Sequence, residues 1–228
     1  MSFYQRLQNE TQAERQYLLE VPLIRDALAG KLPLESYTAF LTQAYHHVKH
    51  TVPLFMAAGS RLGDQHEWVR QAMAEYITEE IGHQEWILND LAACGVDQEA
   101  VRNSAPAIPT ELMLAYAYDT IQRKNPLSLF GMVQVLEGTS ISVATPAAEK
   151  LQSSLNLPGK AFSYLLSHGS LDQDHIVFFE NLVNRFDDRA TQNDIIHSAK
   201  VFYALYGDIF RSVHTGVNEI PQPRENAA

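Results

Sequence analysis

Residues 161–186, AFSYLLSHGSLDQDHIVFFENLVNRF, contain the pattern that decides the fold. Read with a helical period, side chains that recur every three or four residues fall on one face of a helix. That face is apolar at both ends, as expected for a helix packed against a core. Two imidazoles and a carboxylate occupy its middle. The members of this stripe are Ala161, Leu165, His168, Asp172, His175, Phe179, Leu182 and Phe186.

The polar middle of the stripe needs a compensating partner, because an unpaired charge is costly to bury. A metal ion would serve, since neutral His and ionised Asp are both metal ligands. A single His on an apolar face is more often a hydrogen-bonded core residue or part of a solvent-facing patch. Three polar groups in an HxxxDxxH pattern favour a site, provided that matching groups occur elsewhere in the chain.

Composition limits the possible classes of protein. The chain has 228 residues, 46% of them hydrophobic, so we expect one domain over residues 1–216 and a mobile tail over residues 217–228. We find no apolar signal-peptide core at the N-terminus and no stretch long enough to span a bilayer. The net charge of −10 argues against nucleic acid and anionic membranes as partners. A single cysteine, Cys94, excludes an internal disulfide and fits a cytoplasmic location.

Almost the whole chain has helical spacing, and no segment shows the period-two alternation of a strand. The sequence therefore predicts an all-α protein of about seven helices. Pro53 is expected to kink the second helix and Pro146 to interrupt the fifth. The segment before Pro109 is expected to be a loop. The expected helices cover residues 3–29, 34–62, 66–93, 110–124, 126–145 and 161–186, and a last helix follows Asp188 and ends near Val217.

The expected third helix carries a candidate pair of ligands. Glu80 and His83 form an E-x-x-H pair on its apolar side, the i, i+3 arrangement by which helical bundles hold iron or manganese. Glu79 stands four residues before His83 and could take the place of Glu80. An isolated E-x-x-H pair arises by coincidence as often as by function, so this pair alone does not establish a site.

A second carboxylate stands alone in an apolar run. Glu137 is the one charged residue between residues 124 and 149, and it shares an inward face with Phe130 and Ala144. Such a carboxylate must be neutralised, hydrogen-bonded or bound to a metal. Taken alone, Glu137 is equally compatible with a structural role and with a chemical one.

Three expected helices thus supply three carboxylates and three imidazoles. This donor set suits a pair of first-row transition ions, because carboxylates bridge two ions while each ion also takes nitrogen. Soft ligands are absent, which disfavours an iron–sulfur cluster or a zinc–thiolate site. The predicted metal ligands are Glu80, His83, Glu137, His168, Asp172 and His175.

These motifs resemble those of the heme-oxygenase-like di-iron oxidases and oxygenases. The shared features are HxxxDxxH late in the chain, a lone inward Glu about thirty residues earlier, and an acidic residue with a His on an earlier helix. Residues 21–48, VPLIRDALAGKLPLESYTAFLTQAYHHV, look like the opening of the wider superfamily that contains TENA thiaminases and pyrroloquinoline-quinone synthase. The resemblance covers about residues 15–215. It implies a heme-oxygenase-like helical bundle, usually a homodimer, with two iron ions, or manganese in one site, enclosed between core helices.

The sequence departs from that family pattern in one respect. Many members have a further carboxylate two turns before the third-helix His, where this chain has Tyr76. The second helix instead offers His46, His47 and His50, of which His47 lies nearest the apolar face. His47, Glu79 and Tyr76 are therefore candidates for an extra ligand or for a residue that contacts a ligand.

The leading functional prediction is an enzyme that uses two metal ions and O2 to oxidise an unidentified small molecule; the sequence names no catalytic residue. One alternative is a metal-independent enzyme resembling the TENA thiaminases, which expects a nucleophilic cysteine on a core helix. Cys94, at a helix end, does not fit that expectation. Heme oxygenase itself needs a His on the first helix, and none precedes His46. The other alternative is a non-catalytic bundle that binds a metal or a partner.

Overall fold

A computed structural model of the chain describes the backbone of residues 1–215 and the side chains of that range except 169–174 and 214–215. Over residues 1–215 every regular element is a helix, and no strand occurs there. The predicted all-α class is therefore confirmed. The expected mobile tail, residues 217–228, lies outside the described residues.

The N-terminal segment forms three short helices rather than one. α1 (Phe3–Glu10) and α2 (Gln12–Leu19) meet at Thr11, whose hydroxyl donates a hydrogen bond to the carbonyl of Leu7. α3 (Pro22–Leu28) begins at a proline, which lacks the N–H needed to continue a preceding helix. The chain then turns at Gly30, as predicted, with a φ of +67°.

The second expected helix is also divided. α4 (Leu34–Val48) and α5 (Thr51–Ser60) are separated at residues 49–50, so the kink predicted at Pro53 lies earlier than expected. Pro53 falls in the first turn of α5, where a missing N–H breaks no helical hydrogen bond.

The prediction of one helix over residues 66–93 is wrong, because this segment forms two helices. α6 (Glu67–Glu80) ends before Ile81, and α7 (His83–Ala93) begins after Gly82. Gly82 has a φ of +94°, a conformation that glycine adopts readily and other residues rarely adopt. Glu80 therefore closes one helix and His83 opens the next, so the E-x-x-H pair does not have the i, i+3 geometry of a continuous helix.

The remaining elements complete the bundle. α8 (Gln98–Arg102) lies in the expected loop and is followed by α9 (Ile108–Arg123). α10 (Leu129–Leu155) continues through Pro146, so the predicted interruption is wrong. Pro146 and Ser142, four residues earlier, are both exposed, and water can therefore satisfy the Ser142 carbonyl that Pro146 leaves without a donor. α11 (Ser163–Val183) and α12 (Arg189–Thr215) follow, and 3-10 turns cover Asp64–His66, Pro126–Ser128 and Gly159–Ala161.

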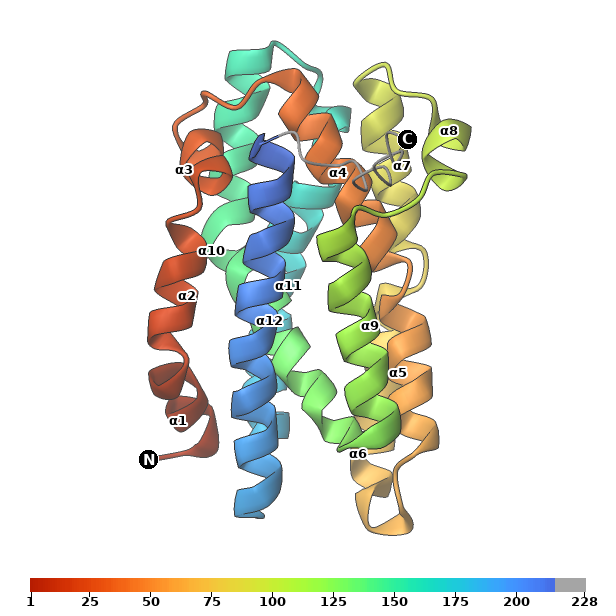
Figure 1. Cartoon of the computed structure of the whole chain (residues 1–228), viewed down its shortest axis with the longest axis vertical. Coiled ribbons are helices and arrows are strands. Elements are labelled where there is room, and N and C mark those ends of the chain that lie inside the picture. Colours follow the sequence, from red (N-terminus) through yellow and green to blue (C-terminus); the bar gives the residue numbers. More distant parts are fainter. Residues whose placement is uncertain (216–228) are drawn as a thin grey trace, which may run out of the picture.

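α10, α11 and α12 form the centre of the packing, with α10 against both of the others. In Figure 1, α12 runs along the long axis in front of α11, α1 to α3 flank one side, and α5, α6 and α9 flank the other. α10 and α12 approach closely at Gly131, where a Cβ would lie 2.6 Å from the backbone nitrogen of Ala199. Buried apolar side chains from α1 to α12 make one continuous core. The described members of the α11 stripe other than His168 are buried, which supports the predicted face.

One segment contradicts the expectation that no stretch could span a bilayer. Pro126–Leu155 is 30 residues long with a mean hydropathy of 1.3 over an 18-residue window, so it is long and apolar enough to cross a membrane. Within the protein, 61% of that window is buried against other helices. The core helix of a bundle has the same length and composition, so this segment is weak evidence for a membrane span.

The break at Gly82 gives a stability prediction. A Cβ at Gly82 would meet no atom within 4 Å, so Gly82→Ala should destabilise the protein through backbone strain alone, by about 1–2 kcal/mol. Gly59→Ala is the control, because Gly59 lies inside α5 and its Cβ would make ordinary contacts. That change should be neutral or stabilising. Urea denaturation measures both, and equal effects would contradict the role assigned to Gly82.

Candidate metal centre

Three side chains from different helices meet inside the bundle. Glu80 of α6, His83 of α7 and His168 of α11 each offer a ligand atom, and these atoms lie within 4.8 Å of one another. Nδ1 of His83 is 3.2 Å from Oε2 of Glu80, and the rings of His83 and His168 are 4.9 Å apart between centroids. The Glu80 side chain is only 11% exposed, so its carboxylate faces the interior. We call these three residues the first cluster.

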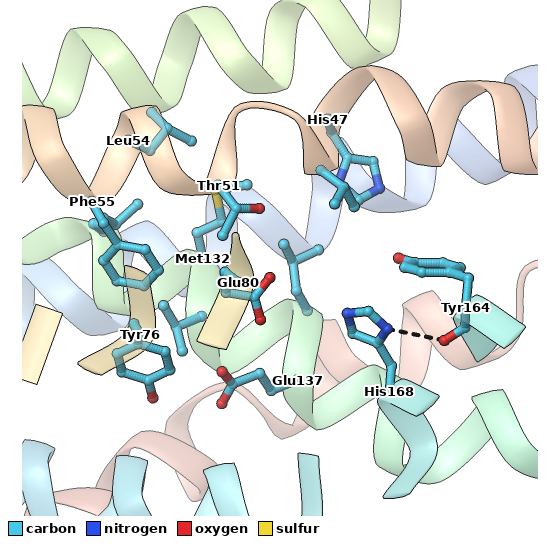
Figure 2. Close-up of a pocket in the computed structure, with 14 residues that line it drawn as sticks. His47, Thr51, Leu54, Phe55, Tyr76, Glu80, Met132, Glu137, Tyr164 and His168 are labelled. Carbon is cyan, nitrogen blue, oxygen red and sulfur yellow. Dashed lines mark hydrogen bonds between the residues drawn. The ribbon is translucent and has the colours of Figure 1, made fainter. Parts of the chain in front are cut away.

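The orientation of His168 is fixed by its own helix. Nδ1 of His168 lies 2.9 Å from the carbonyl oxygen of Tyr164, and a carbonyl can only accept, so Nδ1 donates (Figure 2). In that tautomer Nε2 carries the lone pair that a metal ligand requires. A backbone carbonyl that holds one imidazole nitrogen is a recurrent way to orient a ligating His.

Glu137 and His175 form a second group. Nδ1 of His175 lies 3.8 Å from Oε1 of Glu137, whose side chain is 12% exposed. Nε2 of His175 lies 2.9 Å from Oε2 of Glu79. Glu79 is therefore not a substitute for Glu80, as the sequence allowed, but a partner of His175, even though its side chain is 53% exposed. We call Glu137 and His175 the second cluster.

Asp172 lies on α11 between His168 and His175, but its side chain is outside the described residues. Its role as a ligand stays a prediction. The same holds for ligation by the other five predicted residues.

A cavity of about 70 Å³ connects the two clusters. Glu80, Glu137 and His168 all line it, together with apolar side chains of α5 and α10. Figure 2 shows the two carboxylates and the His168 ring directed toward this common space. Tyr76 also lines the cavity and stacks on Phe55 with ring centroids 4.9 Å apart. Residues far apart in sequence thus converge on one interior space.

The three histidines of α4 have different surroundings. His46 contacts the Ser104 hydroxyl at 2.9 Å, and His50 contacts the Tyr118 hydroxyl at 3.0 Å. His47 alone of the three lines the cavity. Burial, with smaller contributions from nearby histidines, lowers the pKa of His47 to about 3, so its ring is neutral at physiological pH.

The charge state of Glu80 suits metal binding. Burial pushes the pKa of Glu80 upward, but the contact with His83 and the nearby rings of His168 and His175 outweigh burial. The pKa of this carboxyl therefore lies below its ordinary value, and Glu80 is ionised at neutral pH. An ionised carboxylate is the form that coordinates a metal.

Sequence reasoning missed Asp90, which connects two of the site helices. From α7, its Oδ1 accepts a hydrogen bond from the backbone N–H of Ser163 at 3.0 Å, and Oδ2 accepts one from Tyr164 at 2.9 Å. Asp90 thus caps α11 one turn before His168. Burial raises the pKa of Asp90, while these hydrogen bonds oppose the shift. A lone carboxylate beside Ile87 and Leu91 is the signal that could have revealed it.

Comparison with known families gives the broad class. Residues 38–207, well over half of the chain, match the sequence model of a family described as iron-containing redox enzymes. The chain belongs to this family. No curated protein matches the sequence.

Solved structures with the same fold include proteins of different descriptions. A domain of unknown function from Shewanella denitrificans with a heme oxygenase-like fold has a TM-score of 0.83 at 22% identity, covering 94% of this chain and 93% of that one. A TenA homologue from Pseudomonas syringae has a TM-score of 0.77 at 14% identity, covering 93% of each chain. The heme oxygenase of Leptospira interrogans has a TM-score of 0.73 at 17% identity, covering 93% and 100%. The predicted heme-oxygenase-like fold is therefore confirmed.

The first cluster fits iron as this family's metal. One carboxylate and two imidazoles are the donors that iron and manganese accept. Nδ1 of His83 is buried and makes no well-aligned hydrogen bond within the described chain. Buried nitrogens are normally satisfied, and a metal ion would account for this one.

Asp90 gives a prediction about this iron-containing redox enzyme. Asp90→Ala would leave two N–H groups of α11 without acceptors, and should lower the free energy of unfolding by about 1–3 kcal/mol. Asp97→Ala is the control, because Asp97 caps the short, exposed α8 in the same manner and water can replace it. Chemical denaturation should show a smaller loss for Asp97→Ala, and equal losses would contradict the role of Asp90.

Glu137 gives a second prediction. The Glu137 carboxylate is buried, and its Oε1 lies 3.8 Å from Nδ1 of His175. Glu137→Gln should therefore leave the metal-free fold as stable or more stable, by on the order of 1 kcal/mol, and should weaken iron binding. Denaturation in the presence of a chelator and elemental analysis after reconstitution measure the two effects. The exposed Glu149 of the same helix supplies the control Glu149→Gln. Destabilisation with unchanged iron content would indicate a structural role.

Proposed function

We propose that the protein is a non-heme di-iron oxidase or oxygenase that uses O2 to oxidise a small molecule. Membership of the family gives iron and redox chemistry, and the number of ions and the reaction are the proposal. The observation that supports it most is that both clusters contribute to one cavity. Glu80 and His168 of the first cluster and Glu137 of the second line the same cavity of about 70 Å³.

The first cluster would hold one ion through Glu80, His83 and His168. The second would hold the other ion through Glu137 and His175, with Asp172 between them on α11. Carboxylates are able to bridge two ions, which suits a cavity with a glutamate from each side. Iron bound there would supply the electrons and the open coordination position that O2 activation requires. Manganese in one position is compatible with the same donors.

The chain's own residues would orient the ligands and exclude water. The Tyr164 carbonyl holds the His168 ring, and Glu79 holds the His175 ring from its solvent side. Such partners fix the direction and basicity of a ligating imidazole. Leu54, Phe55 and Met132 form part of the apolar wall, which leaves little room for bulk water beside the reacting molecules.

The metal-independent alternative finds little support in the structure. Its chemistry expects a cysteine nucleophile facing the cavity, and Cys94 is instead the residue that ends α7. Burial raises the pKa of the Cys94 thiol to about 11, so the thiol is protonated at neutral pH. A protonated thiol is a poor nucleophile.

We propose a homodimer in the cytoplasm that takes a small molecule and O2 and binds neither nucleic acid nor membrane. The net charge of −10 supports the exclusion of polyanions.

Metal analysis tests the proposed function. Protein purified without chelators and reconstituted anaerobically with Fe(II) should bind up to two iron ions per chain by elemental analysis. Asp172→Ala should lower that ratio without unfolding the bundle, because α11 keeps Phe179 and Leu182 to pack against the core. Glu80→Gln should lower it as well. Glu75→Gln, an exposed glutamate on the same helix, is the control and should not change the ratio.

Exposure of the reconstituted protein to O2 completes the test. Consumption of O2 that depends on bound iron, and that falls in Glu80→Gln but not in Glu75→Gln, is the expected result. Reconstituted protein that remains metal-free would show that the di-iron proposal is wrong.

A further inference from the structure

Some polar side chains in the cavity belong to neither cluster, and His47 is one of them. His47 of α4 is 2% exposed, and its Nδ1 has no hydrogen-bond partner among the described residues. The group of ligand atoms that lie within 4.8 Å of one another contains Glu80, His83 and His168, but not His47. A buried nitrogen without a partner costs free energy unless a ligand or another group satisfies it.

His47 lines the cavity, and its ring also packs edge-to-face against Tyr206 of the core, with ring centroids 5.8 Å apart. It lines the same space as His168 and Tyr164, and Figure 2 shows its ring on the side of that space away from the two glutamates. Thr51, one turn further along the chain, also lines the cavity, and Figure 2 shows its hydroxyl directed inward. The α4–α5 junction therefore presents an imidazole and a hydroxyl to whatever occupies the cavity.

The charge around this end of the cavity restricts its ligand. No lysine or arginine is found among the described residues that line the cavity. His47 and Thr51 are neutral hydrogen-bonding groups, and apolar side chains that include Val48, Leu129 and Val133 line the same cavity. A charged head group would have no counter-charge at this end, and burial without one is costly. A neutral group with an O–H satisfies the imidazole and the hydroxyl without that cost.

We propose that His47, with Thr51, binds the polar end of the substrate, and that the substrate is a small, largely apolar molecule carrying an uncharged hydroxyl group. This inference rests on the proposed function, because it places the substrate between His47 and the two clusters. The hydroxyl would be held at the α4–α5 junction, and the apolar part would extend toward Glu80 and Glu137. Pockets of this kind are mostly apolar, with a few polar groups that fix orientation.

The size of the cavity sets the probes. A cavity of about 70 Å³ is roughly half the volume of a protein cavity that holds benzene. Suitable probes are therefore ethanol, its carboxylate analogue acetate, and chloroethane, which has a similar size without an O–H.

The first measurement uses metal-free protein with 15N-labelled histidine. Titration with ethanol should shift the ring nitrogens of His47 and leave those of His46 and His50 unchanged, since both already have partners outside the cavity. Acetate and chloroethane should not shift the His47 nitrogens. If ethanol leaves the His47 nitrogens unchanged, or acetate binds more tightly than ethanol, the proposed ligand class is wrong.

The second measurement compares two variants. His47→Phe keeps a ring of similar size and should bind ethanol about tenfold more weakly, with unchanged affinity for chloroethane. It should melt at the same temperature as the parent or higher, because a buried unsatisfied nitrogen is removed. His50→Phe, outside the cavity, is the control and should bind both probes as the parent does.

The iron content separates this inference from the proposed function. After Fe(II) reconstitution, His47→Phe should bind as much iron as the parent. A lower ratio would make His47 a metal ligand, and an equal loss of affinity for both probes would make it a packing residue, so either result overturns the inference. A parent protein that binds no iron contradicts the proposed function instead, and the ethanol titration in metal-free protein still tests His47.

Discussion

The structure depends on the burial of carboxylates in an apolar bundle. Glu80 and Glu137 are about nine-tenths removed from water, and each faces a cavity with largely aliphatic and aromatic walls. Desolvation opposes the ionised form of both groups. Imidazoles of α7 and α11 lie beside them and offset part of this cost. α6, α7, α10 and α11 must therefore meet at one level of the bundle, which constrains the path of the whole chain.

Helical spacing predicted much of this arrangement from the sequence. The apolar stripe of α11 and the isolation of Glu137 both follow from a period that places every third or fourth residue on one face. Such spacing identifies the helix face that a side chain occupies. The packing of those faces into one core then brings the side chains of different helices together. The lone-carboxylate argument was sound for Glu137, and it would have applied equally to Asp90.

Other features could not be predicted because they depend on local backbone geometry or on distant contacts. The break at Gly82 requires a positive φ, which glycine permits but does not impose. Pro146 ought to end a helix, yet α10 continues where the freed carbonyl faces water. The contact between Glu79 and His175 joins residues almost one hundred positions apart, and no local pattern indicates it. The capping of α11 by Asp90 is also a tertiary contact.

The fold alone leaves the chemistry open. TenA homologues and heme oxygenases have the same arrangement of helices as this chain at identities below 20%. Function therefore has to be argued from the residues inside the bundle. In this chain those residues are carboxylates and imidazoles around a small cavity, with a further imidazole at its other end. The Nδ1–H of His168 donates to the Tyr164 carbonyl, and Nε2 of His175 lies 2.9 Å from the Glu79 carboxylate, so both rings are held in set directions.

The helix break at Gly82 separates the positions of two side chains of the site. Because α6 ends at Glu80 and α7 begins at His83, the two residues are not locked to one helical phase. A substitution that rotates α7 can redirect His83 while Glu80 keeps its place. Within a continuous helix the same rotation would move both side chains together. The break at Gly82 therefore allows mutation or protein engineering to change the position of His83 while the position of Glu80 is kept.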